Sequence, residues 1–219
     1  MRFHLGAPPL NDDFQPQEDG WTPLPEPSPL MVNVLAIPFG VFAAILLAQG
    51  WALGVYFFDP QLGIDPAGSD LGQPAYAAVL FVALVASLLG IIAAHELIHG
   101  LGYPHFGLTR STVLGVWPSK LLFYAGYLKS LRRDRWLIVY LLPFLVLSVS
   151  PLIVYRVWGI DAAGQPRSEQ VWAWLYFLSL LNGLFSGGDL LYVLLILLQI
   201  PRRAVLQNQG WSTWWKLPR

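Results

Sequence analysis

Long apolar runs alternate with shorter polar segments along the chain. Four runs carry almost no charge and are about 20 residues or longer, near Met31 to Phe58, Tyr76 to Gly102, Trp136 to Trp158 and Val171 to Ile200. A helix needs about 20 apolar residues to cross the hydrocarbon core of a bilayer. The pattern predicts about four transmembrane helices, with a break in the fourth at Gly187-Gly188.

The segment between the second and third runs has a strand-like pattern. Thr109 to Trp117 and Leu121 to Tyr127 are rich in β-branched and aromatic residues and flank Pro118-Ser119. Two such runs around a turn predict a hairpin. The expected fold class is therefore an all-α membrane protein with a small hairpin-like insert between the second and third transmembrane helices.

The two ends of the chain differ from the apolar middle, residues 31–200. Residues 1–30 hold seven of the 18 prolines and five acidic residues against one Arg, which predicts a disordered lead. Residues 201–219 carry Trp211, Trp214, Trp215 and Lys216, which predicts a tail that lies at the membrane interface.

Composition supports a membrane protein and restricts its chemistry. Hydrophobic residues make up 55% of the chain and charged residues 12%, whereas soluble domains carry roughly a quarter charged residues. The formal net charge is zero, so we expect lipid but no nucleic acid as a partner. Because the chain has no cysteine, any metal ion must be held by His, Asp or Glu.

The distribution of basic residues predicts the orientation. The loop between the first two runs has no Lys or Arg, and the next loop has six: Arg110, Lys120, Lys129, Arg132, Arg133 and Arg135. Basic loops stay in the cytosol. We therefore expect a multi-pass integral membrane protein with the insert and both termini cytosolic.

Few ionisable residues lie inside the apolar runs, away from their ends: His95, Glu96 and His99 in the second run and Asp189 in the fourth. Each costs about 2.5 to 3.5 kcal/mol at the centre of a membrane helix, even on the lenient insertion scale. A functional site that needs these side chains would account for them.

The first three residues form the pattern His-Glu-x-x-His. Positions i and i+4 share one helix face, so His95 and His99 can bind one tetrahedral zinc ion. Glu96 lies beside them, where a carboxylate can take a proton from water and pass it to a leaving amine. The pattern predicts a zinc peptidase site with Glu96 as the general base.

The third zinc ligand has two candidates. His105 extends the pattern to that of metzincins, which also need a downstream Met-turn, but both methionines, Met1 and Met31, lie upstream. Asp189 lies at a similar expected depth in the membrane. We favour Asp189 as the ligand and expect His105 at the mouth of the loop, as a bystander or a substrate contact.

Several motifs carry a family resemblance: His95 to Gly100, Leu142-Pro143-Phe144, Asn182, Ser186 to Leu190 and Ile200-Pro201. Together they resemble the DUF3267 family of membrane zincins, which is known mainly from bacterial genomes, and more distantly the site-2 proteases. The resemblance implies a bacterial membrane peptidase with His95, His99 and Asp189 as zinc ligands. It also implies that Asn182 helps to hold the substrate.

Two functions are compatible with these observations. The first is an intramembrane zinc metallopeptidase that hydrolyses peptide bonds of membrane or membrane-proximal substrates, which would add as a strand beside Leu121 to Tyr127. The alternative is a non-enzymatic assembly or regulatory protein with a structural or vestigial metal site. Three visible ligands leave a fourth zinc position open, which favours catalysis.

Overall fold

The computed structural model describes residues 1–52, 73–159 and 169–218, and these residues are mostly helical. Three helical stretches are long and apolar enough to cross a membrane: Pro29–Trp51, Ala75–Gly102 and Arg133–Gly159. The first two belong to α1 (Pro29–Ala52) and α2 (Gln73–Gly102). Residues 53–58 of the expected first helix, most of the loop after it that has no Lys or Arg, and residues 160–168 lie outside the described residues.

The third stretch is irregular after each of its inner prolines. It starts as α3 (Arg133–Phe144), widens into a π-helical turn over Leu145–Val149, continues as α4 (Ser150–Val154) and ends in a second π-helical turn over Tyr155–Gly159. Proline removes a backbone donor from the regular helical ladder. Such widened turns are a recognised consequence of irregularities in that ladder.

The fourth apolar run is broken, as expected. The helices α5 (Glu169–Phe185) and α6 (Gly187–Gln199) meet at Ser186 at an angle of 46°, and together they form a fourth candidate span. The break allows α6 to leave the direction of α5. It therefore sets the direction from which Asp189, in the first turn of α6, enters the interior.

Two small sheets correct the expectation of an all-α fold. One has the order β1-β3-β4, with β1 (Arg2–Leu5) parallel to β3 (Thr112–Trp117) and β4 (Leu122–Tyr127) antiparallel to β3. The β3–β4 pair is the predicted hairpin, and the short helix Pro118–Lys120 forms its turn. A second short helix, Pro104–Gly107, follows α2.

The second sheet has the order β2-β7-β6-β5 and joins the two ends of the chain. It contains the antiparallel hairpin of β6 (Val205–Gln209) and β7 (Ser212–Lys216), with β2 (Thr22–Pro23) and β5 (Leu131–Arg132) on its edges. The expected interfacial tail is thus a hairpin, and its placement at the membrane stays a prediction.

The lead over residues 1–30 was expected to be disordered, and this expectation is wrong. Its strands β1 and β2 add to open edges of β3 and β7, and Phe14, Trp21 and Leu24 are buried. Composition indicates only that such a segment cannot bury enough apolar surface by itself. Here the remainder of the chain supplies both the strand edges and the apolar partners.

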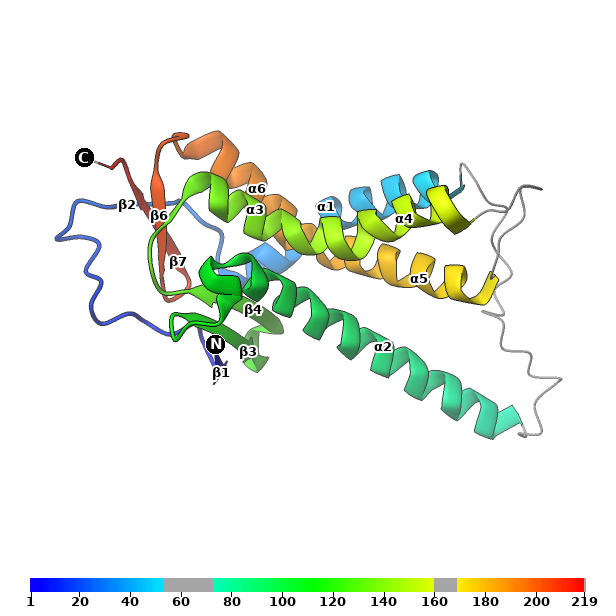
Figure 1. Ribbon diagram of the computed structural model, residues 1–219. Helices are drawn as coiled ribbons and strands as arrows, with labels where there is room; N and C mark the ends of the chain where they lie inside the picture. The colour runs from blue at the N-terminus through cyan, green and yellow to red at the C-terminus, as the bar shows by residue number, and fades with distance from the viewer. Residues whose placement is uncertain (53–72, 160–168, 219) are drawn as a thin grey trace.

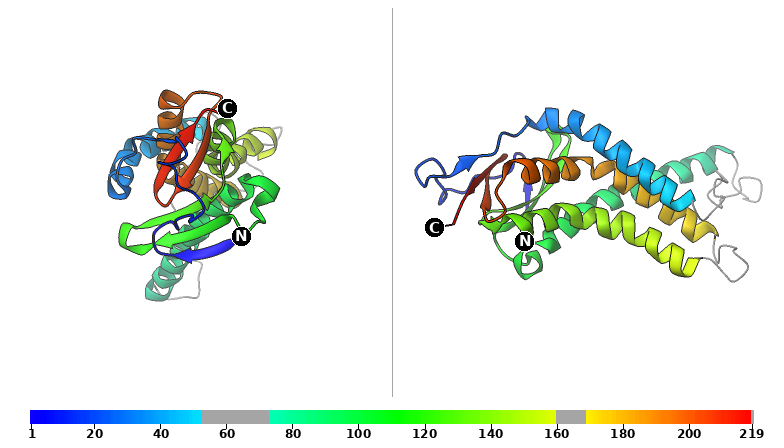
Figure 2. Two further views of the ribbon diagram at one scale, coloured as in Figure 1. Left: turned by 90° about the vertical axis from the view of Figure 1, so that its left-hand side faces the viewer. Right: turned by 90° about the horizontal axis from the view of Figure 1, so that it is seen from above.

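Both sheets and both termini lie at the same end of the helices (Figure 1). Viewed from that end, the strands stand in front of the helix ends (Figure 2, left). The aromatic side chains of Tyr103, Tyr127 and Trp136 pack together where the helices meet the sheets. Trp136 Nε1 donates a hydrogen bond to the carbonyl of Leu206 in β6, 3.2 Å away. This junction fixes the sheets against the cytosolic ends predicted for the helices.

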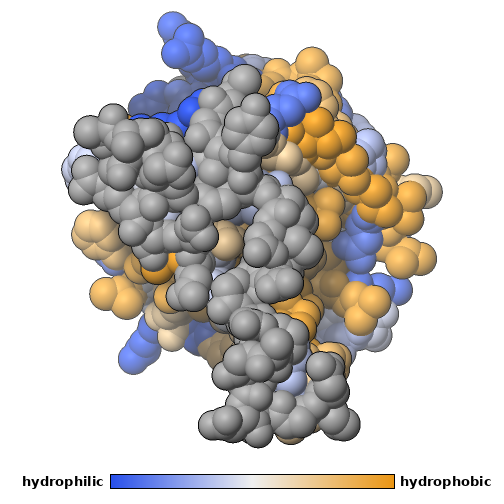
Figure 3. Space-filling view, turned by 90° about the vertical axis from the view of Figure 1, so that its right-hand side faces the viewer, coloured by the Kyte–Doolittle hydropathy of each residue, from blue (hydrophilic) through white to orange (hydrophobic). Residues whose placement is uncertain are grey.

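Much of the helical surface is apolar and not covered by protein. Only 6% of the most apolar stretch of α2 is buried inside the protein. Away from the sheets, α2 also diverges from the other helices (Figure 1). Hydrophobic side chains are also prominent on the face opposite the sheets (Figure 3). Three or four helices of this kind are consistent with a membrane protein.

Glycines allow α1 to pack directly against the break between α5 and α6. A methyl group at Gly40 would overlap the backbone carbonyl of Leu184, and one at Gly187 would overlap the carbonyl of Ala36. Such close backbone approach is a common way for helices to associate where lipid removes the hydrophobic driving force. The position of α6, and with it that of Asp189, therefore depends on Gly187.

This packing yields a matched pair of variants. Gly187→Ala is expected to destabilise the protein by about 1 to 3 kcal/mol, because the added methyl group must displace the α1 backbone. Gly188→Ala is the control, since a methyl group there would meet nothing within 4 Å. Thermal unfolding of both variants in detergent micelles measures the difference, and equal midpoints would contradict the proposed packing.

Candidate metal centre

The His-Glu-x-x-His segment lies near the end of α2, one turn before Gly102 closes the helix. Pro104 cannot extend the helix, and Tyr103 anchors its end. The Tyr103 ring stacks on Tyr127 at 5.1 Å between centroids, and its hydroxyl donates to the carbonyl of Ala125 at 3.0 Å. The end of α2 is therefore held against β4.

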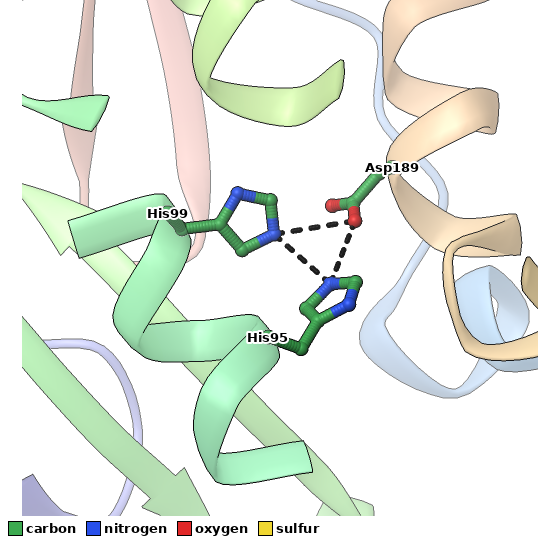
Figure 4. A group of neighbouring side chains, drawn as sticks. All are labelled: His95, His99 and Asp189. Carbon is green, nitrogen blue, oxygen red and sulfur yellow. Dashed lines mark hydrogen bonds and ion pairs between the residues drawn. The ribbon is translucent and has the colours of Figure 1, made fainter. Parts of the chain in front are cut away.

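Three side chains converge in the interior, from α2 and α6 (Figure 4). His95 Nε2 lies 2.9 Å and His99 Nε2 3.2 Å from Asp189 Oδ2, and the two Nε2 atoms are 3.1 Å apart. Both histidines are buried. Among the residues that the structure describes, these three form the one group with the spacing of a metal site.

The opposite ring nitrogens determine which nitrogen carries the proton. His99 Nδ1 lies 2.8 Å from the carbonyl of Val139, which can only accept, so Nδ1 donates. His95 Nδ1 lies 2.8 Å from Asn182 Oδ1, which also accepts. In neutral rings both Nε2 atoms therefore present lone pairs toward Asp189.

The amide orientation of Asn182 follows from its other partners. Its Nδ2 donates to the carbonyl of Pro143 at 3.2 Å and to Ser148 Oγ at 2.8 Å. Ser148 in turn donates to the carbonyl of Ser179. Because a carbonyl cannot donate, Nδ2 must face Pro143, which leaves Oδ1 as the acceptor for His95.

The resulting arrangement fits a zinc ion. When both rings are neutral, two lone pairs and a carboxylate oxygen face a common point, where they repel one another unless a proton or a metal ion lies between them. A tetrahedral ion with bonds of about 2.0 to 2.1 Å separates its ligand atoms by roughly 3.3 Å. The observed separations of 2.9 to 3.2 Å are close to that value. His95, His99 and Asp189 are thus a chemically suitable ligand set.

Glu96 is placed differently from the three converging residues. Its side chain is partly exposed and lines a cavity of about 540 Å³ that also contains both histidines and Asp189. Neither a hydrogen bond nor an ion pair ties down its carboxylate among the described residues. A carboxylate beside a metal site, open to a cavity, is available for proton transfer.

The remaining predicted site residues are not in the cavity. His105 is exposed in the short helix after α2 and lies outside the converging group in the described part of the chain. Asn182 is fully buried, with no part in the cavity lining. Its hydrogen bond with His95 places it behind one of the converging residues, and the substrate contact implied by resemblance stays a prediction.

Sequence reasoning missed the polar network behind His95. Ser179, Asn182 and Ser186 are buried and recur at intervals of three and four residues along α5 and its end. This interval places them on one helix face. A polar stripe in an otherwise apolar helix was the signal that could have revealed the network.

Comparison with known proteins adds a family. The model of the DUF3267 family, described as "putative zincin peptidase", matches residues 88–205, which is more than half of the chain. This region runs from α2 to the start of β6 and includes all three converging residues. Neither a curated protein nor a solved structure matched in two further comparisons.

The orienting role of Asn182 predicts a metal phenotype. Asn182→Ala should lower zinc affinity by about 10 to 100-fold, because His95 loses the partner that fixes its tautomer and ring direction. Competition with a chromophoric chelator measures the affinity. Ser150→Ala, on the exposed side of the third span, is the control and should bind like wild type. Unchanged zinc affinity of Asn182→Ala would show that Asn182 does not orient His95 for metal binding.

Proposed function

The chain belongs to the DUF3267 family, and on that basis we propose that it is an intramembrane zinc metallopeptidase. Its substrates are membrane or membrane-proximal proteins. The observation that carries the proposal is the convergence of His95 Nε2, His99 Nε2 and Asp189 Oδ2 beside Glu96. The family description supports the class of reaction, and the side-chain geometry supports the metal.

In this proposal His95, His99 and Asp189 hold the zinc ion. Three protein ligands leave one position open, whereas structural zinc sites usually have four. When bound, zinc supplies Lewis acidity, which activates water near neutral pH and polarises a peptide carbonyl. All three side chains line the cavity, so water and substrate would reach them from it.

Glu96 is the general base and acid. One carboxylate oxygen accepts a proton from the attacking water, and the same oxygen then delivers it to the nitrogen of the departing amine. The absence of fixed partners for Glu96 among the described residues supports this role, because a carboxylate held in an ion pair would be a weaker base.

The wall of the cavity supports binding of an extended substrate segment. β4 is the edge strand of its sheet, and its residues from Leu122 to Tyr127 line the cavity beside the metal centre. An extended segment added to this edge would pass close to Glu96. The basic central loop supports a cytosolic position for the cavity, with the apolar helices embedded in a bacterial membrane.

Replacement of Glu96 tests the catalytic role. Glu96→Gln should retain zinc and lower the rate of peptide hydrolysis at least about 100-fold, because the variant cannot accept the proton from water. The measurement pairs a zinc assay with hydrolysis of an unfolded protein such as casein by micelle-embedded protein. Wild-type hydrolysis by the zinc-loaded variant would contradict the peptidase mechanism.

A further inference from the structure

A third carboxylate, that of Glu26, lines the same cavity as Glu96 and Asp189. It comes from the N-terminal lead, just before α1. The pairing of β2 with β7 and the hydrogen bond from Leu24 N to the carbonyl of Thr213, 2.9 Å, hold this part of the lead in place. Glu26 therefore occupies a defined position in the cavity wall.

The carboxylate of Glu26 is half-buried and has no balancing cation among the described residues. Oε2 accepts a hydrogen bond from the Tyr192 hydroxyl at 2.9 Å, and Oε1 accepts one from the backbone N–H of Thr213. Burial raises the pKa of Glu26, while these two hydrogen bonds act in the opposite direction. No Lys or Arg forms an ion pair with it among the described residues. A carboxylate has about four acceptor positions, so it can still accept bonds from a ligand.

Aromatic rings lie on the Tyr192 side of this carboxylate. Tyr192 stacks on Tyr140 with 5.5 Å between ring centroids, and Trp211 lies edge-on to Tyr192 at 6.4 Å. The Trp211 indole donates to the carbonyl of Pro27, which ties it to the lead. All three rings line the cavity. Aromatic faces attract cations, and more strongly where water is excluded.

Glu26 and the three aromatic rings lie close enough to the metal centre for a single bound peptide to contact both. Tyr192 follows Asp189 by three residues, which places the two on neighbouring turns of one helix face. The described lining contains no Lys or Arg. A cation that entered the cavity would thus meet Glu26 without competition from a resident basic side chain.

We propose that Glu26, Tyr140, Tyr192 and Trp211 form a specificity subsite for a basic side chain, Arg or Lys, of the peptide substrate. The inference rests on the proposed peptidase function, because it names the class of substrate for that site. The cation is bound by the carboxylate and the rings while the scissile bond lies at the metal centre.

Anchoring of the lead alone would be a different role for Glu26. The lead is already anchored by the β2–β7 pairing, by buried Leu24 and by the Trp211–Pro27 hydrogen bond. A neutral amide would serve an anchor equally well, since Gln keeps an acceptor for Thr213 and offers a donor to Tyr192. The charge of Glu26 is thus the property to test, by Glu26→Gln.

The experiment uses the zinc-loaded full chain in dodecyl maltoside. Pairs of internally quenched peptides differ at one position, Arg in one and citrulline, its neutral isostere, in the other, and this position is moved along the peptide. Wild type should favour Arg by about tenfold in kcat/KM at one position. In Glu26→Gln this ratio should fall to about one, whereas Glu18→Gln, in the exposed part of the lead, should keep it.

Equal cleavage of both peptides at every position, or a preference that persists in Glu26→Gln, would overturn the subsite. Should no peptide be cleaved, the peptidase proposal fails, and fluorescence anisotropy of the same peptides on Glu96→Gln protein decides the inference separately. If the Arg peptide binds more tightly than the citrulline peptide, and this difference is lost when Glu26→Gln is added, the subsite is supported. Loss of the preference when phosphatidylethanolamine is added would assign the site to a lipid amine and overturn it.

Discussion

The structure depends on an electrostatic constraint at the centre of its apolar interior. The Nε2 atoms of two imidazoles and one carboxylate oxygen face one another at 2.9 to 3.2 Å, and in the neutral rings the hydrogen bonds to Asn182 and Val139 place the proton on Nδ1. In that state the three groups repel one another unless a proton or a metal ion lies between them, and in an apolar environment the repulsion is weakly screened. A divalent ion bound between them would remove this repulsion and would supply the chemistry of the proposed zinc peptidase.

The surrounding packing serves to bring these groups together from separate helices. Gly187 allows α6 to approach α1, the break at Ser186 directs Asp189 inward, and Tyr103 fixes the end of α2 against β4. Each imidazole then donates one hydrogen bond that orients it, His99 to the Val139 carbonyl on α3 and His95 to Asn182 on α5. The cavity next to this centre has one wall from an edge strand and another from the N-terminal lead. A site that belongs to no single element needs such close packing to keep its geometry.

The sequence predicted the parts that local pattern determines. Apolar runs revealed the helices, Gly187-Gly188 revealed the break, and the β3–β4 hairpin followed from its strand-like residues. The converging trio could be named because ionisable residues are rare in apolar runs, and Asp189 stood alone in the fourth. The strands of the lead and tail could not be predicted. The pairing of residues 2–5 with residues 113–116, for example, is a long-range contact that composition does not reveal. Asn182 was noticed through resemblance, but only its partners reveal that it faces His95.

The central claim is that Asp189, and not His105, completes the metal centre. Zinc content of the purified full chain, measured by mass spectrometry in wild type, Asp189→Ala and His105→Ala, tests it most directly. We expect about one zinc ion per chain in wild type and in His105→Ala, and a substantial loss in Asp189→Ala. Retention of zinc by Asp189→Ala together with its loss from His105→Ala would contradict it.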